Sequence, residues 1–365
     1  MKNFLLLALF ASSVSLFAQN KMVGFSPSGR SGEPNSGGTI FESNPDGSNF
    51  TVLKNFVFDQ VGNLKHDLAK GPDNFLYGVS NIWDGNLPCI FFFKIEPSSS
   101  TLTLLHKFEG FTEALCAPVW GQDGFFYFCG ASTDNEKRKV MRVSANGQDA
   151  QVLANIPLPY SSYQQSAECF QLYNNSPGSF VMVLPGNRLA RYSAGSSSLQ
   201  TIKQFQEGIE GRLQCIEVAL NGKVYGTLEK FLPPTTFQHN LFQINADGIG
   251  YALVETDPIG FDFGSVKDFM VWNDSLMYSI NYFGLWQCRI LKINLNSKKV
   301  DIVFTESAYD TDYGSQKLLK TSEGNIIFPT SEGIWKIAPD GTTLSKITPF
   351  NYPQGWPASQ ILEMS

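Results

Sequence analysis

Apolar runs and turn-forming residues recur together along the chain, beginning with Thr39–Phe56. Two apolar runs there flank Asn44-Pro45-Asp46-Gly47, a pattern that predicts a β-hairpin. Six more copies of this hairpin lie at 91–108, 139–156, 188–205, 241–257, 289–306 and 333–350. Between them, further hairpins are predicted at 66–80, 117–130, 169–185, 215–228, 268–281 and 317–330. Each repeat therefore contains four short strands.

The spacing of the repeats predicts the fold. The turns begin at Pro45, Pro97, Ala145, Ala194, Ala246, Leu295 and Pro339, so they are 44 to 52 residues apart, a period typical of propeller blades. One inner hairpin is split between the chain ends, with Ala358–Glu363 as its first strand and Met22–Ser26 as its second. The sequence predicts an all-β fold, a single seven-bladed β-propeller closed by both termini. A two-sheet sandwich, the alternative, would not explain why the two ends complete one repeat.

The first 18 residues have the pattern of a secretory signal peptide. Lys2 precedes an apolar run that ends at Ala18. A membrane anchor would need about 20 continuous apolar residues, and Ser12, Ser13 and Ser15 interrupt this run. We expect a signal peptide at 1–18 and the propeller at 19–365. The mature protein is then secreted, either periplasmic or extracellular, with no membrane insertion once the signal is removed.

The first repeat contains Gly38-Thr39-Ile40-Phe41, then Asn44–Ser48, then Phe50–Leu53 and Phe56. These residues resemble the tandem GloVer-type repeat of secreted bacterial proteins, and Phe75–Ser80 and Lys223–Thr227 are similar to the next strand of that repeat. Repeats from residue 139 onward keep the hairpin but lose the Gly-Thr-Ile-Phe start. The resemblance implies a secreted, propeller-like array, often part of a surface-anchored protein, with no established activity.

Charge and rare residues exclude several kinds of site. The formal net charge is −6 and no basic run occurs, so nucleic acid is not an expected partner. The three histidines, His66, His106 and His239, are predicted to lie at different radii of the disc, and we expect no metal and no cofactor. No G-x-S-x-G motif indicates a serine hydrolase.

Cysteine positions suggest one disulfide. Cys116 and Cys129 lie at equal distances from the turn centred on Gln122-Asp123. In a regular two-residue hairpin they would face each other, close enough for a disulfide. Two buried free thiols are the alternative.

Aromatic residues are concentrated in the segments between the hairpins that we assign to one face of the disc. They are Trp83, Phe111, Tyr160, Tyr163, Phe231, Phe237, Phe261, Phe263, Tyr282, Phe283, Trp286, Tyr309, Tyr313, Tyr352 and Trp356. Aromatic rings stack on sugars or anchor protein partners, and Asp262, Asp310 and Asp312 nearby can accept hydrogen bonds from hydroxyl groups.

The leading hypothesis is therefore a secreted, monomeric binding module for a glycan or an extracellular protein, with no assigned catalytic residue. A propeller glycosidase or polysaccharide lyase is the second hypothesis. It would use loop carboxylates, the three aspartates above or Glu207 and Glu210. A structural or adhesive surface component is the third.

Overall fold

The computed structural model describes residues 21–26, 36–57, 66–84, 87–134, 137–157, 170–172, 176–232, 236–256, 265–283, 287–307, 317–330, 333–349 and 360–364. Every regular element in these ranges is a β-strand. None of the described residues belongs to a helix that could cross a membrane.

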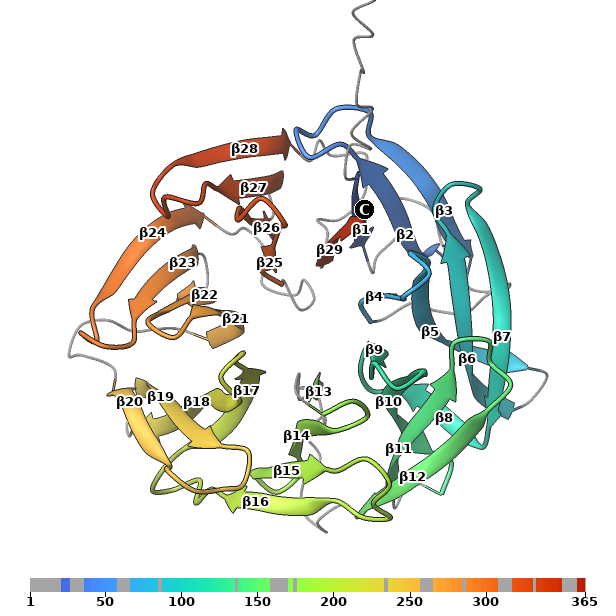
Figure 1. Ribbon diagram of the computed structural model, residues 1–365, viewed down its shortest axis with the longest axis horizontal. Helices are drawn as coiled ribbons and strands as arrows, with labels where there is room; N and C mark the ends of the chain where they lie inside the picture. Colours follow the sequence, from blue (N-terminus) through green and yellow to red (C-terminus); the bar gives the residue numbers. More distant parts are fainter. Residues whose placement is uncertain are drawn as a thin grey trace, which may run out of the picture.

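Seven antiparallel sheets stand around a central axis, confirming the predicted seven-bladed propeller (Figure 1). From the axis outward, blade 1 is β29 (Gln360–Met364), β1 (Lys21–Ser26), β2 (Ser36–Ser43) and β3 (Thr51–Val57). Blade 2 is β4 (Ala69–Lys70), β5 (Leu76–Asp84), β6 (Leu87–Glu96) and β7 (Thr101–Glu109). Blade 3 is β8 (Phe111–Ala114) and β9 (Val119–Trp120), then β10 (Phe125–Ser132), β11 (Lys137–Ser144) and β12 (Ala150–Pro157).

The remaining blades have four strands each, in the same order from the axis outward. Blade 4 is β13 (Phe170–Leu172), β14 (Phe180–Leu184), β15 (Arg188–Tyr192) and β16 (Gln200–Gln204). Blade 5 is β17 (Arg212–Val218), β18 (Lys223–Leu232), β19 (Thr236–Asn245) and β20 (Ala252–Thr256). Blade 6 is β21 (Ser265–Asn273), β22 (Leu276–Phe283), β23 (Gln287–Asn294) and β24 (Val300–Ser307). Blade 7 is β25 (Leu319–Lys320), β26 (Ile326–Thr330), β27 (Gly333–Ile337) and β28 (Leu344–Pro349).

Both ends of the described chain meet in blade 1, as the repeat arithmetic predicts. Strand β29 pairs antiparallel with β1, with Val23 opposite Leu362 and Gly24 opposite Ile361. Strand β1 in turn pairs with β2. The first blade is thus completed by the last strand of the chain, so the ring has no open edge between its ends.

A β-bulge occurs at the same place in the outer strand of all seven blades. The register between third and fourth strands shifts by one residue each time, which leaves an extra aliphatic residue in the outer strand. These residues are Leu53, Leu105, Leu153, Ile202, Val254, Val303 and Ile347, each eight positions after the first turn residue of its repeat. Bulges twist a strand and interrupt its ladder, so they protect the seven outer edges from pairing with other chains.

Blade 3 differs from the prediction in the register of its inner hairpin. Trp120 lies opposite Phe126 and Val119 opposite Tyr127, and the Gly121 N–H donates to the Phe125 carbonyl, so the turn is longer than two residues. Pro118, which has no N–H, separates β8 from β9. Cys116 therefore lies in an irregular segment and does not pair with Cys129 as the two-residue hairpin requires.

The two thiols are nevertheless neighbours. The Cys129 N–H donates to Cys116 Sγ over 3.2 Å. Both cysteines are buried, and both are free thiols in this structure. The side-chain interaction with the Cys116 thiol, together with burial, raises the pKa of the Cys129 thiol well above its usual value. A disulfide between them under oxidising conditions stays a prediction.

Candidate functional site

Most of the residues predicted to form an aromatic ligand face lie outside the described ranges. They are Tyr160, Tyr163, Phe261, Asp262, Phe263, Trp286, Tyr309, Asp310, Asp312, Tyr313, Tyr352 and Trp356. Trp83 is described, but in a strand: it continues β5 and pairs with Pro88 of β6. Phe111 also lies in a strand, β8, and is buried against Phe108. Four more predicted loop residues lie in strands, namely Phe231 in β18, Phe237 in β19, and Tyr282 and Phe283 in β22. For these six residues the loop placement was wrong, because the strands run further than the turn signals indicate.

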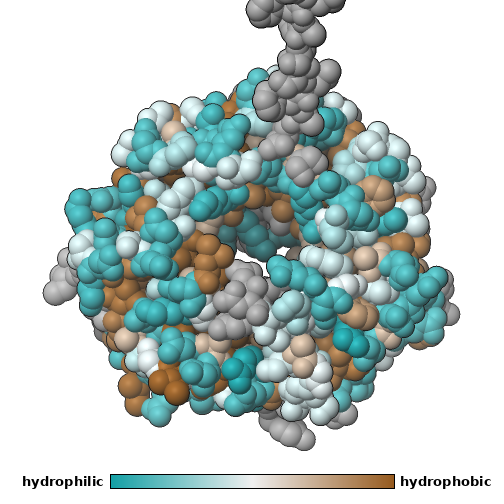
Figure 2. Space-filling view, in the orientation of Figure 1, coloured by the Kyte–Doolittle hydropathy of each residue, from teal (hydrophilic) through white to brown (hydrophobic). Residues whose placement is uncertain are grey.

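The structure instead brings four charged side chains together near the axis. They are Asp67, just before β4, Glu217 on β17, Asp268 on β21, and Lys317, just before β25. These innermost segments come from blades 2, 5, 6 and 7 and surround the centre of the ring (Figure 1). The space-filling view shows an opening at that centre (Figure 2). We call the four residues the axial cluster.

Local sequence explains why Asp67, Asp268 and Lys317 occupy equivalent positions along the propeller axis. Asp268 pairs with Ile280, two residues beyond Tyr278. Asp67 precedes Tyr77 by ten positions, as Asp268 precedes Tyr278 and Lys317 precedes Ile327. The same place in three repeats therefore carries a charged residue. In blade 5 that place is taken by Cys215, and the charge sits two residues later, at Glu217.

Lys317 is the centre of the cluster. Its Nζ lies 3.2 Å from Oδ2 of Asp67, whose side chain is only 4% exposed. This ion pair joins blade 7 to blade 2 across blade 1. The N–H of Leu318, the next residue, donates to Oδ2 of Asp268 over 2.8 Å. Blade 6 is thereby tied to the same segment of blade 7, and the ammonium and the carboxylates are held at fixed places.

Two carboxyl groups of the cluster have unusual proton affinity. Burial, followed by the nearby charge of Asp268, raises the pKa of Glu217 to about 8, although Lys317 opposes the change. Burial also raises the pKa of Asp268 to about 6, while Lys317 and the Leu318 N–H lower it. Both residues are half-buried. At neutral pH, Glu217 is mainly protonated and Asp268 mainly ionised.

Such a pair meets the chemical requirements for proton transfer. A neutral carboxyl can donate a proton and an ionised neighbour can accept one, which is how two acids take different roles in one site. Lys317 adds a positive charge that can stabilise a developing oxyanion. No group of three or more potential metal ligands occurs among the residues that the structure describes.

The loop acids suggested by the sequence take a different part where they are described. Glu210 forms an ion pair with Lys203, with Nζ and Oε1 2.9 Å apart, and accepts a hydrogen bond from the Gln206 N–H. These contacts brace a turn between blades 4 and 5. The carboxyls near the axis were missed by the sequence analysis, which searched the loops.

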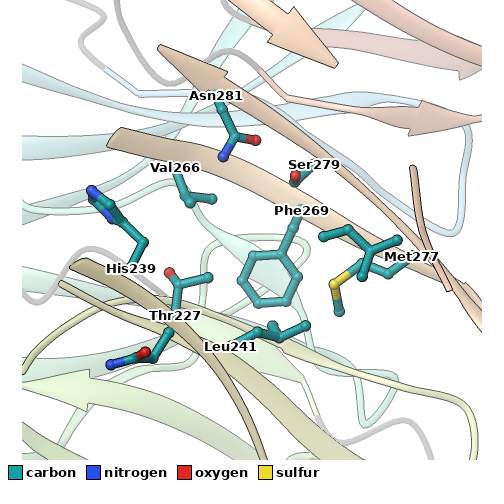
Figure 3. A pocket seen from close by; sticks show the side chains of 10 residues that line it. Thr227, His239, Leu241, Val266, Phe269, Met277, Ser279 and Asn281 are labelled. Atoms are coloured by element: carbon teal, nitrogen blue, oxygen red, sulfur yellow. The ribbon is translucent and has the colours of Figure 1, made fainter. Parts of the chain in front are cut away.

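A second hollow lies between blades 5 and 6 (Figure 3). Its wall combines apolar residues such as Leu241, Phe269 and Met277 with the polar Thr227, His239, Asn240, Ser279 and Asn281. The Oδ1 of Asn240 and the Oγ of Ser279 are buried and have no hydrogen-bond partner among the described residues. The space is small and its wall contains no carboxylate or ammonium group, so it offers fewer groups for catalysis than the axial cluster.

Comparisons with known proteins extend the fold assignment. No family model and no curated protein sequence matches the chain, so the GloVer resemblance has no support from a family match. The periplasmic gluconolactonase of Pseudomonas aeruginosa superposes with a TM-score of 0.64 at 13% identity, over 95% of this chain and 99% of that one. A candidate 6-phosphogluconolactonase from Bacteroides uniformis gives 0.61 at 13% identity, over 94% and 99%. An oligogalacturonate lyase in complex with manganese gives 0.53 at 10%, over 91% and 86%. At such identities the likeness shows the propeller fold alone.

Proposed function

We propose that this protein is a propeller hydrolase that opens sugar lactones at the axial cluster. The observation that carries the proposal is the pair of carboxyls beside Lys317: the pKa of Glu217 is raised to about 8 and that of Asp268 to about 6. Carboxyls in a concave site with strongly shifted pKa values are the usual acids and bases of enzymes. This proposal favours the enzyme hypothesis of the sequence analysis, with acids on inner strands in place of loop acids.

Each group has a defined role in the proposed reaction. Asp268 accepts a proton from water, and the water oxygen bonds to the lactone carbonyl carbon. Lys317 stabilises the resulting oxyanion, and Asp67 holds the Lys317 ammonium in place. When the ring C–O bond breaks, Glu217 donates its proton to the departing alkoxide oxygen. Water and lactone give a hydroxy acid, and the proton on Asp268 returns to Glu217 through solvent.

The structural neighbours lend support of a limited kind. Two carry lactonase names and a third is named an oligogalacturonate lyase. Propellers with this arrangement therefore accommodate carbohydrate chemistry. Because unrelated activities share one fold, the residues at the axis have to carry the argument.

The test is hydrolysis of glucono-δ-lactone by the purified protein, corrected for spontaneous ring opening. We expect a bell-shaped pH profile of kcat/KM, with limbs near the two pKa values. Glu217→Gln and Asp268→Asn should each lower kcat by about 100-fold or more. Asp301→Asn is the matched control, since Asp301 lies on outer strand β24 beside Lys299.

Two results would reject the proposal. One is the absence of turnover above the spontaneous rate on a panel of sugar lactones. The other is full activity in Glu217→Gln. Activity on glycosides but not on lactones, lost in the same two variants, would keep the site and replace the substrate.

Ligand binding through the aromatic loops, the leading hypothesis from the sequence, stays a second proposal. One described feature favours it: Phe231 and Leu232 end strand β18 with 52% and 37% of their surface exposed. Replacing Trp286, Tyr309 and Trp356 with alanine should abolish binding on a glycan array while leaving Tm nearly unchanged. Equal binding by the triple variant would move the ligand site elsewhere.

A further inference from the structure

The buried thiols of Cys116 and Cys129 form a pair that the proposed hydrolysis does not use. The Leu115 N–H donates to the Cys129 carbonyl over 2.8 Å, and the Cys129 N–H donates to Cys116 Sγ over 3.2 Å. These bonds hold the segment between β8 and β9 against β10 at the place where the two side chains meet. Each thiol changes the pKa of the other through direct contact, so a bond between the two sulfur atoms requires little movement.

The surroundings of the two thiols are unequal. The Cys129 thiol, the Cys129 N–H and the charge of Lys317 lower the pKa of Cys116, although burial opposes them. Contact with Cys116, together with burial, raises the pKa of Cys129. Cys116 also keeps 5% of its surface exposed, whereas Cys129 has 0%. Because the thiolate is the reactive form of cysteine, Cys116 has the properties of an attacking thiol and Cys129 those of a resolving thiol.

The other described cysteines have different surroundings. Cys89 Sγ donates to a backbone carbonyl over 3.6 Å, and Cys215 Sγ lies 3.1 Å from a threonine hydroxyl. Burial, followed by a nearby carboxylate charge, raises the pKa of Cys288 to about 12, so its thiol stays protonated. Among the residues that the structure describes, Cys116 and Cys129 are therefore the thiols placed to react with each other.

The segment that ends at Cys116 is also bonded to blade 2 beside the axial cluster. The Ala114 N–H donates to Asn81 Oδ1, and the Ala114 carbonyl accepts a hydrogen bond from His66 Nε2, both over 2.8 Å. His66 directly precedes Asp67 of the axial cluster. A covalent bond from Cys116 to β10 would therefore restrict the segment that contacts His66.

We propose that Cys116 and Cys129 are a redox pair that small-molecule disulfides convert to an internal disulfide, which fixes the segment contacting His66. The Cys116 thiolate bonds to one sulfur of the small disulfide, whose S–S bond breaks and releases one small thiolate. Cys129 then gives its proton to solvent, and its sulfur bonds to Cys116 Sγ, which releases the second small thiolate. The protons that leave Cys116 and Cys129 end on the two small thiols, so two protein thiols and one disulfide give one protein disulfide and two thiols. None of these steps depends on the proposed hydrolysis.

The first experiment incubates the full folded chain with 2-hydroxyethyl disulfide, quenches samples with acid and maps the cysteines by mass spectrometry. We expect a Cys116–Cys129 disulfide in the parent, preceded by a mixed disulfide on Cys116. Cys129→Ala should stop at that mixed disulfide, and Cys116→Ala should be modified at Cys129 at least about tenfold more slowly. Cys215→Ala, in blade 5, is the matched control and should form the internal disulfide at the parent rate.

The second experiment measures the effect on the neighbouring segment by hydrogen exchange. The disulfide links residues 13 positions apart, so it should restrict the opening of the chain between them and beside them. The Leu115 amide and the Ala114 amide should exchange at least about tenfold more slowly after oxidation. The Ala219 amide, which donates to the Lys223 carbonyl in blade 5, should not change.

Three results would overturn the proposal. The first is a parent protein whose two thiols stay free under conditions that modify the urea-unfolded chain completely. The second is modification of Cys129 in Cys116→Ala at an equal or higher rate than modification of Cys116 in Cys129→Ala. If either variant does not fold, the site of the first mixed disulfide in the parent decides the order of attack instead. The third is unchanged exchange of the Ala114 and Leu115 amides in the fully oxidised protein.

Discussion

The junction between blades 2 and 3 and the junction between blades 5 and 6 join equivalent strands in different ways. Between blades 2 and 3, the rings of Tyr77, Phe92 and Phe126 pack on one another, with centroids 4.3 to 5.7 Å apart. Between blades 5 and 6, the ring of Phe269 borders a hollow that also has hydroxyl, amide and imidazole groups on its wall (Figure 3). One junction is closed by aromatic surface, and the other is partly open.

The comparison separates the blades that pack most tightly from the blades that contain the carboxyls with raised pKa values. Aromatic rings fill space at little polar cost, so blades 2 and 3 share the large buried cluster that includes Tyr127 and Phe128. Buried polar groups need hydrogen-bond partners, and burying them without partners costs free energy. The two carboxyls with raised pKa belong to blades 5 and 6. The two blades that border the hollow thus also contain the two carboxyls with raised pKa, which fits the usual trade between stability and function.

The largest difference between the junctions should follow from removing one ring on each side. Phe126→Ala leaves a cavity among close-packed aromatic rings and should lower the free energy of unfolding by about 4 kcal/mol. Phe269→Ala enlarges an existing hollow, loses fewer contacts and should cost about 2–3 kcal/mol. Urea unfolding of the two variants measures both values. A larger loss for Phe269→Ala would show that the hollow junction is the better packed one.

The second effect concerns how stability depends on pH through Glu217 of blade 5. In the folded state, the pKa of Glu217 is raised to about 8, above the unfolded value of about 4.3. The stability that this shift provides is complete below about pH 4 and is lost as pH rises towards 8, because the unfolded chain releases the proton more readily. Glu217→Gln should therefore gain stability relative to the parent between pH 5 and 8. Parallel stability curves for parent and variant would contradict the shift.

A smaller effect is expected from a hydroxyl on the aromatic side. The Tyr77 hydroxyl donates to Asp73 Oδ2 over 2.8 Å, which braces the inner turn of blade 2. Tyr77→Phe keeps the ring and should cost about 1 kcal/mol. Asp73→Asn retains an oxygen acceptor and should cost less than Tyr77→Phe. If the phenylalanine variant is as stable as the parent, the closed junction depends on its rings alone.

The smallest effect should have the opposite sign. The Ser279 Oγ is buried without a hydrogen-bond partner among the described residues, so it has lost hydration without compensation. Ser279→Ala should leave stability unchanged or raise it by up to about 1 kcal/mol. A clear loss in urea unfolding would show that the hydroxyl has a partner, such as an ordered water in the hollow.

The ring, its closure and its outer hairpins were predictable because each repeat contains its own signals. Turn residues such as Asp46-Gly47 and Asp340-Gly341 fix the hairpins, and the fixed offset to the bulged residue repeats in every blade. The axial cluster was not predicted, because it joins residues as far apart as Asp67 and Lys317. Its inner strands are also short, since β4 and β25 have two residues each. The available signal was a charged residue ten positions before the equivalent second-strand residue in three repeats, namely before Tyr77, Tyr278 and Ile327.

The pairing of β29 with β1 has a consequence for the order of folding. Blades 2 to 7 consist of neighbouring hairpins, so they can form while the chain grows from its N-terminus. Strand β1 can pair with β2 at once, but its other edge must wait for residues more than 330 positions later, since Val23 also faces Leu362. Closing so long a loop is slow compared with local pairing. We expect the amides of β29 to be the last to gain protection in pulse-labelled hydrogen exchange during refolding, with blades 2–7 protected before that point. Until then the ring remains an open arc with exposed strand edges at both ends, so the final residues of the chain determine how long the protein is vulnerable to aggregation.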